Sequence, residues 1–213
     1  MKNLLFYAIV GGAILSLAFT ATGAIPDTTT QQVATVGEPA PNFTLTGGDG
    51  KTHALADYKG KFVVLEWTNP NCPFVHKFYD SGSMQKFQKD ETSKGVVWLR
   101  INSSAQGHDG YQVASDIAAY EKENHVASSV TLMDPSGTVG HTYGATNTPQ
   151  MFVIDKKGIL IYAGGIDDTP SFDAADIPKA KNYVVAALSE AMAGKSVSVP
   201  TARPYGCSVK YAN

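Results

Sequence analysis

The chain has 213 residues, a formal net charge of −2 and 43% hydrophobic residues. This composition is that of a globular protein with room for one domain and a full apolar core. No basic patch stands out, so the charge pattern argues against a nucleic-acid-binding protein. Two cysteines are too few for a disulfide-rich scaffold, so apolar packing must hold the fold together.

The first residues are typical of a secretory signal peptide. Residues 1–3 make a short basic start, residues 4–19 are almost wholly apolar, and residues 22–24 are small enough for cleavage. We therefore expect a signal peptide over residues 1–24, with an uncleaved N-terminal anchor as the alternative. In either case the folded part would be exported, to the periplasm or the extracellular space. After removal of the signal we expect no membrane association.

The rest of the chain is expected to form a linker, one domain and a tail. The linker covers residues 25–35, which are polar and rich in threonine and glutamine. The domain covers residues 36–194, and the tail, residues 195–213, carries Cys207. The tail is rich in proline and valine, and we expect it to be extended.

In the first half of the domain, a hairpin is expected where alternating residues 43–46 meet a glycine-rich turn. Residues 62–67 then form a nearly continuous apolar strand, as in a sheet covered on both faces. A helix is expected from Pro73 to Tyr79. Residues 81–83 should interrupt it before it resumes over residues 84–94.

The second half alternates further strands with helices. The expected elements are a strand over residues 96–101, a helix over 111–124 with Val113 and Ile117 on its inner face, a strand over 130–133, a short helix over 139–143, a hairpin of 151–154 with 159–162, and a helix over 178–193. This order predicts an α/β protein with a mixed sheet and helices on both faces.

Cys72 is the residue that tells most about function. It follows the apolar strand and a short polar turn, and Pro73 is of a type favoured in the first turn of a helix. Cys72 should therefore lie at or beside the N-cap, where free backbone N–H groups and the helix dipole favour a thiolate. We expect Cys72 to be an attacking thiol. The alternative is a buried structural cysteine.

The strand, the Cys-Pro helix start, Thr148-Pro149 and the terminal hairpin and helix together resemble the thioredoxin fold. More narrowly, the chain resembles an exported subgroup of the redoxin, peroxiredoxin-like (AhpC/TSA-related) proteins. The resemblance runs from about Val36 to the C-terminus and is carried by residues 37–43, 71–75, 148–155, 164–168 and 203–211. It implies a thioredoxin-like α/β fold: a mixed central sheet flanked by helices, an N-terminal hairpin and an extended C-terminal tail.

The chain departs from the family patterns at three positions. Thioredoxins use Cys-x-x-Cys, but Val75 stands where their second cysteine would be. Typical peroxiredoxins use Pro-x-x-x-Thr/Ser-x-x-Cys, but Leu65 stands at the proline position and Asn69 at the threonine position. Neither thioredoxin-type reduction nor typical peroxidase chemistry therefore transfers intact.

Cys207 is the only other cysteine and the candidate resolving thiol. A thiolate that has attacked a peroxide or a disulfide needs a second thiol to release it. A static disulfide that ties the tail down, and two thiols that never meet, are the alternatives, since sequence alone does not assign connectivity. The resemblance also implies that Pro149 is cis and lies against Cys72, shaping the substrate groove. An ordinary proline at the start of a strand is the alternative.

Several neighbours of Cys72 are candidates for supporting roles. His76 follows four residues later, so it could share a helix face with Cys72 and assist the thiolate, bind a soft metal with it, or have no role. Glu66 could relay protons or be solvated. The residues expected to line or support the groove are Trp67, Asn69, Pro73, His76 and Thr148.

The leading hypothesis is an exported thiol-dependent oxidoreductase. Cys72 attacks a peroxide or a protein disulfide, Cys207 condenses with the product, and an external thiol reductant resets the pair. We expect no metal and no organic cofactor. The alternative is a non-catalytic thioredoxin-fold binding or metal-delivery module, which the missing Cys-x-x-Cys and threonine keep open.

Overall fold

The computed structural model describes residues 33–212. The predicted signal peptide and most of the predicted linker lie outside the described residues. None of the helices within residues 33–212 is long and apolar enough to cross a bilayer.

A seven-stranded mixed sheet forms the centre of the described part, in the order β2-β1-β5-β4-β3-β7-β8. Its strands are β1 (Thr44–Gly47), β2 (Thr52–Ala54), β3 (Val63–Trp67), β4 (Val97–Asn102), β5 (Val130–Met133), β7 (Gln150–Ile154) and β8 (Leu160–Gly164). The pairs β3–β4 and β4–β5 are parallel, and the others are antiparallel. This is the predicted α/β architecture with its N-terminal hairpin.

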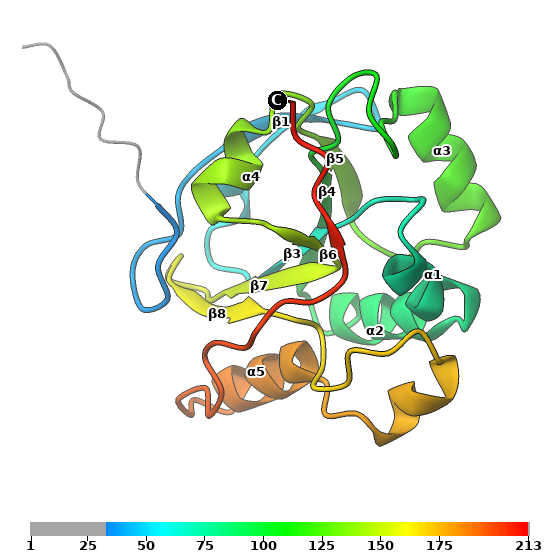
Figure 1. Cartoon of the computed structure of the whole chain (residues 1–213). Helices are drawn as coiled ribbons and strands as arrows, with labels where there is room; N and C mark the ends of the chain where they lie inside the picture. Colours follow the sequence, from blue (N-terminus) through cyan, green and yellow to red (C-terminus); the bar gives the residue numbers. More distant parts are fainter. Residues whose placement is uncertain (1–32, 213) are drawn as a thin grey trace, which may run out of the picture. The chain divides into compact units, whose positions relative to one another are not determined.

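The helices lie around this sheet (Figure 1). They are α1 (Pro73–Asp80), α2 (Ser83–Thr92), α3 (Ala114–Glu123), α4 (Thr138–Tyr143) and α5 (Tyr183–Met192), with the 3-10 turns η1 (Leu55–Tyr58) and η2 (Ala174–Lys179). Gly82, at φ +73°, separates α1 from α2 at the predicted interruption. A residue with a side chain would be sterically strained at this positive φ, and glycine is not.

Strand β3 divides the core into two halves because its side chains alternate between the two faces of the sheet. Leu65 and Trp67 pack on one face, with residues of α4. Val64 packs on the other face, with residues of α1, α2 and α5. Every residue of β3 is buried, as expected for a central strand covered on both sides.

Two helix boundaries differ from the sequence prediction. Val113 is the N-cap of α3 and is 43% exposed, so it does not lie on the inner face of the helix. Helix α5 begins at Tyr183 rather than at 178, because the Asn182 side chain caps it by accepting a hydrogen bond from the backbone N–H of Val185. Pro178 belongs to the preceding turn η2.

The C-terminal tail is extended and pairs with the rest of the fold at two places. Thr201 forms a bridge with Ala163 of β8. Further on, β9 (Cys207–Ser208) pairs antiparallel with β6 (Asn147–Thr148). In Figure 1 the red tail runs from the end of α5 past β8 to β6, which carries Cys207 to the segment that precedes Pro149.

Candidate active site

The structure places Cys72 at the N-cap of α1, with Pro73 in the first turn of the helix. The backbone N–H groups of Val75 and His76 both donate to the Cys72 carbonyl at 2.9 Å, which anchors the helix start to this residue. The Cys72 side chain is only 2% exposed. The thiol therefore lies buried beside the N-terminal backbone of a helix.

Cys207 meets Cys72 at this helix start. Both cysteines are free thiols, and their Sγ atoms lie 2.7 Å apart although 135 positions separate them in the chain. The contact is made by the tail, since the register of β6 and β9 sets Cys207 opposite Thr148. The sequence left three alternatives open: a resolving thiol, a static disulfide, and two cysteines that never meet. The contact between the two sulfurs shows that the third alternative is wrong.

The third component of the site is the Thr148–Pro149 segment. Its peptide bond is cis, as the family resemblance implied. The Thr148 carbonyl oxygen lies 3.1 Å from Cys72 Sγ and accepts a hydrogen bond from the thiol. The Thr148 side chain is buried, and its hydroxyl has no hydrogen-bond partner among the described residues.

The two sulfurs differ in electrostatics and in exposure. Burial and, after it, the adjacent Cys72 together raise the pKa of Cys207 from 9.0 to about 12. Cys207 therefore keeps its proton near neutral pH. Cys207 is also partly exposed, whereas Cys72 lies beneath the surface.

Asn69 and Asn71 build the loop that leads into the site. The Asn69 side-chain carbonyl accepts from the Asn71 backbone N–H at 2.8 Å, and its amide donates to the Asp109 carbonyl. Asn71 in turn donates to the Asp109 carboxylate at 2.7 Å. These hydrogen bonds make the turn and fasten it to the neighbouring loop, so the Asn69 amide is engaged away from the thiol.

His76 and Trp67 lie apart from the thiol pair. The His76 side chain is 43% exposed and contacts Asp80 on the helix surface, at 3.3 Å. Trp67 is fully buried in the core half opposite Cys72, and its indole N–H donates to the Ser103 hydroxyl. Trp67 supports the site through the sheet and does not line a groove.

Glu66 is buried and fully engaged, so the solvated alternative is wrong. Its carboxylate accepts hydrogen bonds from the Tyr79 hydroxyl at 2.8 Å and the Trp98 indole at 2.7 Å. The Arg100 guanidinium lies 3.7 Å away and is also buried. The hydrogen bond from Tyr79, a residue of α1, to Glu66 of β3 helps to hold this helix against the sheet. No sequence pattern predicted that Tyr79, Trp98 and Arg100 would meet at Glu66.

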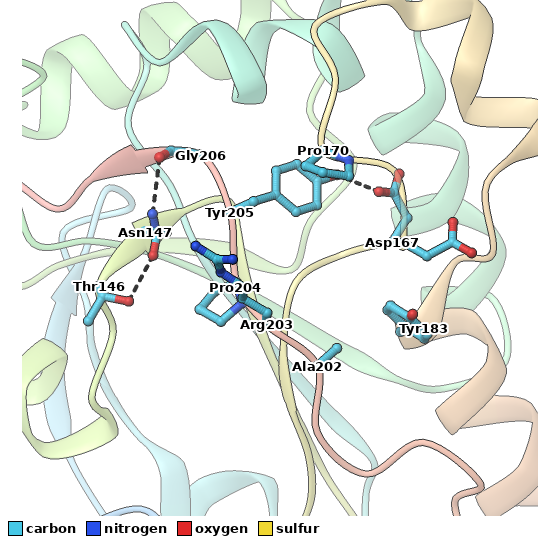
Figure 2. Close-up of a pocket in the computed structure, with 11 residues that line it drawn as sticks. Thr146, Asn147, Asp167, Pro170, Tyr183, Ala202, Arg203, Pro204, Tyr205 and Gly206 are labelled. Atoms are coloured by element: carbon cyan, nitrogen blue, oxygen red, sulfur yellow. Dashed lines mark hydrogen bonds between the residues drawn. The ribbon is translucent and has the colours of Figure 1, made fainter.

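A cavity of about 780 Å³ lies along the C-terminal tail, and Gly206, the residue before Cys207, is part of its lining (Figure 2). Its walls come from four segments that are distant in sequence, and the lining residues are 146–147, 167–168 with 170, 183 and 202–206. Sequence analysis did not identify it, because no local pattern marks residues that come together only in the folded chain. No group of three or more His, Cys, Asp or Glu residues that could hold a metal occurs within residues 33–212.

Comparisons with known proteins agree with this fold. Solved structures that superpose well are a hypothetical protein from Sinorhizobium meliloti 1021 and an uncharacterized conserved protein from Geobacillus kaustophilus. Both align with a TM-score of 0.71 at 25% identity, covering 85% and 84% of this chain and 97% and 93% of theirs. A putative protein disulfide isomerase from Bacteroides thetaiotaomicron shares the fold, with a TM-score of 0.50 at 22% identity, over 62% of this chain and 79% of its own.

Curated relatives include two proteins named for thiol chemistry. Thiol-disulfide oxidoreductase ResA of Bacillus thuringiensis subsp. konkukian (strain 97-27) is 29% identical over 133 residues, or 62% of this chain and 71% of ResA. Thiol:disulfide interchange protein DsbE of Escherichia coli (strain K12) is 27% identical over 179 residues, or 78% of this chain and 84% of DsbE.

Fold and site together define a redoxin of the thioredoxin superfamily, with its cysteine at the start of a helix. The model of the AhpC/TSA family matches residues 36–163. The chain belongs to the AhpC/TSA family.

Proposed function

We propose that this protein is an exported thiol–disulfide oxidoreductase whose Cys72 and Cys207 alternate between a dithiol and a disulfide. The observation that carries the proposal is the 2.7 Å contact between the two sulfurs at the start of α1. The names of the relatives ResA and DsbE support it, since both describe exchange between thiols and disulfides.

In the reduced protein, the Cys72 thiolate attacks one sulfur of a substrate disulfide. The substrate S–S bond breaks, a mixed disulfide forms at Cys72, and the other substrate sulfur leaves as a thiolate that takes up a proton. Cys207 then loses its proton and attacks Cys72 Sγ. This second exchange releases the reduced substrate and leaves the Cys72–Cys207 disulfide, so two electrons pass to the substrate.

Access to Cys72 depends on Cys207. Because Cys72 is only 2% exposed and Cys207 lies against it, a large substrate reaches Cys72 only when the tail cysteine moves aside. The strand that holds Cys207 has two residues, each paired with one residue of β6. The tail on either side of it is also held by hydrogen bonds of the Gly206, Val209 and Lys210 backbone. We propose that this short segment opens locally, so that the tail acts as both cover and resolving group.

A protein disulfide fits the site better than a peroxide. In typical peroxiredoxins the residue at the position of Asn69 is a threonine or serine, and here the Asn69 side chain is engaged by the loop at Asn71 and Asp109. No hydroxyl from that position is available to orient a peroxide. We therefore propose a protein disulfide as the substrate and an external thiol as the reductant.

Export is proposed from the sequence of residues 1–24. A charged start, an apolar stretch and small residues at the end are the features that secretion machinery recognises. Expression of the full chain followed by cell fractionation tests it. The expected result is a processed protein outside the cytoplasmic membrane, and a full-length protein retained in the cytoplasm would contradict export.

Single cysteine variants test the redox proposal with insulin as a disulfide substrate and dithiothreitol as the reductant. Cys72→Ser should abolish catalysed turnover, because it removes the attacking sulfur. Cys207→Ser, reduced and then freed of dithiothreitol before insulin is added, should stop at a mixed disulfide between Cys72 and the substrate, visible by mass spectrometry under non-reducing conditions. Hydrogen peroxide consumption in parallel distinguishes a peroxidase.

Two results would contradict the proposal. One is insulin reduction by Cys72→Ser at the wild-type rate. The other is a Cys72–Cys207 disulfide with a reduction potential below about −300 mV, which is the range of permanent structural disulfides. Such a bridge would make the protein a static scaffold.

A further inference from the structure

The cavity along the C-terminal tail has one free positive group among its lining residues, Arg203. The Arg203 side chain is exposed and makes no hydrogen bond or ion pair within residues 33–212. In Figure 2 its guanidinium lies near Pro204, on the side of the cavity formed by Thr146 and Asn147. An unpaired guanidinium in a concave site is a good partner for a carboxylate, which it can bind through two parallel hydrogen bonds.

The far wall of the same cavity is acidic. Asp167 lies there with Tyr183, well separated from Arg203 in Figure 2. The neighbouring Asp168 accepts from the backbone N–H of Lys181 and from the Thr169 hydroxyl. These hydrogen bonds lower the pKa of Asp168, so it is ionised at neutral pH. Both of them go to Oδ1, so Oδ2 has no hydrogen-bond partner among the described residues and can accept one from an ammonium group.

The cavity has a positive charge at Arg203 and negative charges at Asp167 and Asp168. It should therefore favour a ligand that carries one negative and one positive group. A carboxylate toward Arg203 and an ammonium toward Asp168 describe a zwitterion such as an amino acid or a short peptide. The volume of about 780 Å³ is within the usual range for small-molecule sites, about 300–1,000 Å³. Gly206 lines the cavity and Cys207 is the next residue in the chain, so the cavity borders the backbone that carries the Cys207 thiol.

We propose that this cavity is the docking site of the reductant, a zwitterionic amino-acid or short-peptide thiol, and that this thiol attacks the Cys72–Cys207 disulfide at Cys207. The inference rests on the proposed function, because it needs that disulfide to form. It adds the class of the reductant, the residues that select it, and the sulfur that it attacks.

Exposure and leaving-group chemistry both favour attack at Cys207. Cys207 is partly exposed, while Cys72 is only 2% exposed. Attack at Cys207 expels Cys72, the sulfur at the N-cap of α1. Attack at Cys72 would expel Cys207, whose pKa is raised to about 12, and a thiol with a higher pKa is a poorer leaving group.

Reduction of the Cys72–Cys207 disulfide consumes two ligand thiols. The first ligand thiolate bonds to Cys207 Sγ, the Cys72–Cys207 bond breaks, and Cys72 leaves as a thiolate. A second ligand thiolate attacks the ligand sulfur of this mixed disulfide and expels Cys207, which takes up a proton. The protein gains two electrons, and the ligand leaves as its own disulfide.

Reduction of the oxidised full-length protein by four thiols tests the cavity. The probes are glutathione and L-cysteine, which carry both charges, N-acetylcysteine, which lacks the ammonium, and 2-mercaptoethanol, which lacks both. Arg203→Met should raise the KM for the first three by about tenfold, the usual effect of losing one charge-assisted contact, and leave 2-mercaptoethanol unchanged. Asp168→Asn should raise the KM for glutathione and L-cysteine only.

Two controls accompany these variants. Lys195→Met removes the same formal charge from a different cavity, so it should leave all four thiols unchanged. Arg203→Lys keeps the charge and should recover part of the affinity. Quenching partial reduction by glutathione with iodoacetamide should give glutathione on Cys207 and the alkyl group on Cys72, by peptide mass spectrometry.

The outcomes separate the two proposals. If dithiothreitol supports insulin turnover but Arg203→Met changes all four thiols equally or none, the cavity does not select the reductant, while the redox function stands. Glutathione found on Cys72 would overturn the assignment of the attacked sulfur. If no reversible Cys72–Cys207 disulfide forms at all, the proposed function itself fails.

Discussion

At the scale of single residues, Gly206 determines whether Cys207 can reach Cys72. Its backbone φ is +120°, and a Cβ added there would lie 2.0 Å from the Thr148 carbonyl oxygen. The same oxygen accepts the hydrogen bond from the Cys72 thiol. Glycine at this position therefore permits a close approach of two backbone segments that fixes the geometry of both sulfurs.

Gly206→Ala is expected to separate the two cysteines. The added methyl group must push β9 away from Thr148, and a displacement of about 1 Å at a reacting pair costs on the order of 100-fold in rate. The measurement is the rate at which the reduced protein forms the Cys72–Cys207 disulfide on addition of oxidised glutathione. Gly60→Ala is the matched control, because Gly60 also has a positive φ, +83°, but a Cβ there meets nothing within 4 Å.

The outcome of this pair of variants is specific. Alanine is unfavourable at both positions because the backbone φ is positive there. A loss of folding stability that both variants share therefore says nothing about the site. Slow disulfide formation in Gly206→Ala alone supports the close approach. Equal rates in Gly206→Ala, Gly60→Ala and the wild type would contradict it.

At the scale of elements, β9 is too short to hold its place alone, and Tyr211 anchors it. The Tyr211 hydroxyl donates to the Ala145 carbonyl at 2.7 Å, and its ring stacks on His141 with centroids 4.0 Å apart. Gly140 lies directly against the ring, where a Cβ would be 2.3 Å from the hydroxyl oxygen. The end of the tail is therefore fitted to α4.

Tyr211→Ala is expected to loosen β9 and uncover Cys72. Losing the ring contact and the hydrogen bond should cost about 3 kcal/mol of docking free energy at most, on the scale of large aromatic truncations. The reaction of Cys72 with iodoacetamide should speed up, and the attack of Cys207 on a mixed disulfide at Cys72 should slow down. Peptide mass spectrometry over a time course measures both.

The conservative variant Tyr211→Phe is the control for this prediction. It keeps the ring on His141 and loses only the hydrogen bond, so its rates should lie close to those of the wild type. An unchanged Cys72 alkylation rate in Tyr211→Ala would show that the anchor does not govern access.

At the scale of the whole molecule, the reduced protein is expected to lose stability at alkaline pH partly through Cys207. The pKa of this thiol is 9.0 in its ordinary state and about 12 in the fold, chiefly because of burial. The folded state thus holds the proton more tightly than the unfolded chain. This contribution is fully present below pH 9 and is lost as the pH rises through about 12.

Urea unfolding at pH 8 and pH 11 measures this contribution. Buried tyrosines act in the same direction, since burial also raises the pKa of Tyr120 to about 12. The tyrosines are common to the wild type and the reduced Cys207→Ser variant. The difference between these two proteins therefore excludes the contribution of the tyrosines to the pH dependence of stability. The wild type should lose more stability between the two pH values than the variant, and an equal loss would contradict the shift. The oxidised wild type, which has no Cys207 thiol, should behave like the variant.

The local features of the sequence determined much of the fold. The start of α1 at Cys72-Pro73, the break at Gly82 and the buried strands β3 and β4 follow from short-range chemistry, because proline, glycine and apolar runs act over a few residues. The start of α5 did not follow, because the cap at Asn182 outweighs the pattern that extends back to Pro178.

The sequence by itself determined that a lone cysteine begins a helix and that one other cysteine exists to pair with it. Only the tertiary structure decided that the two meet, that Glu66 is buried beside Arg100, and that Arg203 lines the same cavity as Asp167 and Asp168. The physical reason is the distance along the chain over which the interactions act. A helix start depends on neighbouring residues, whereas contacts across 135 positions depend on how the tail docks on β6, which no local pattern encodes.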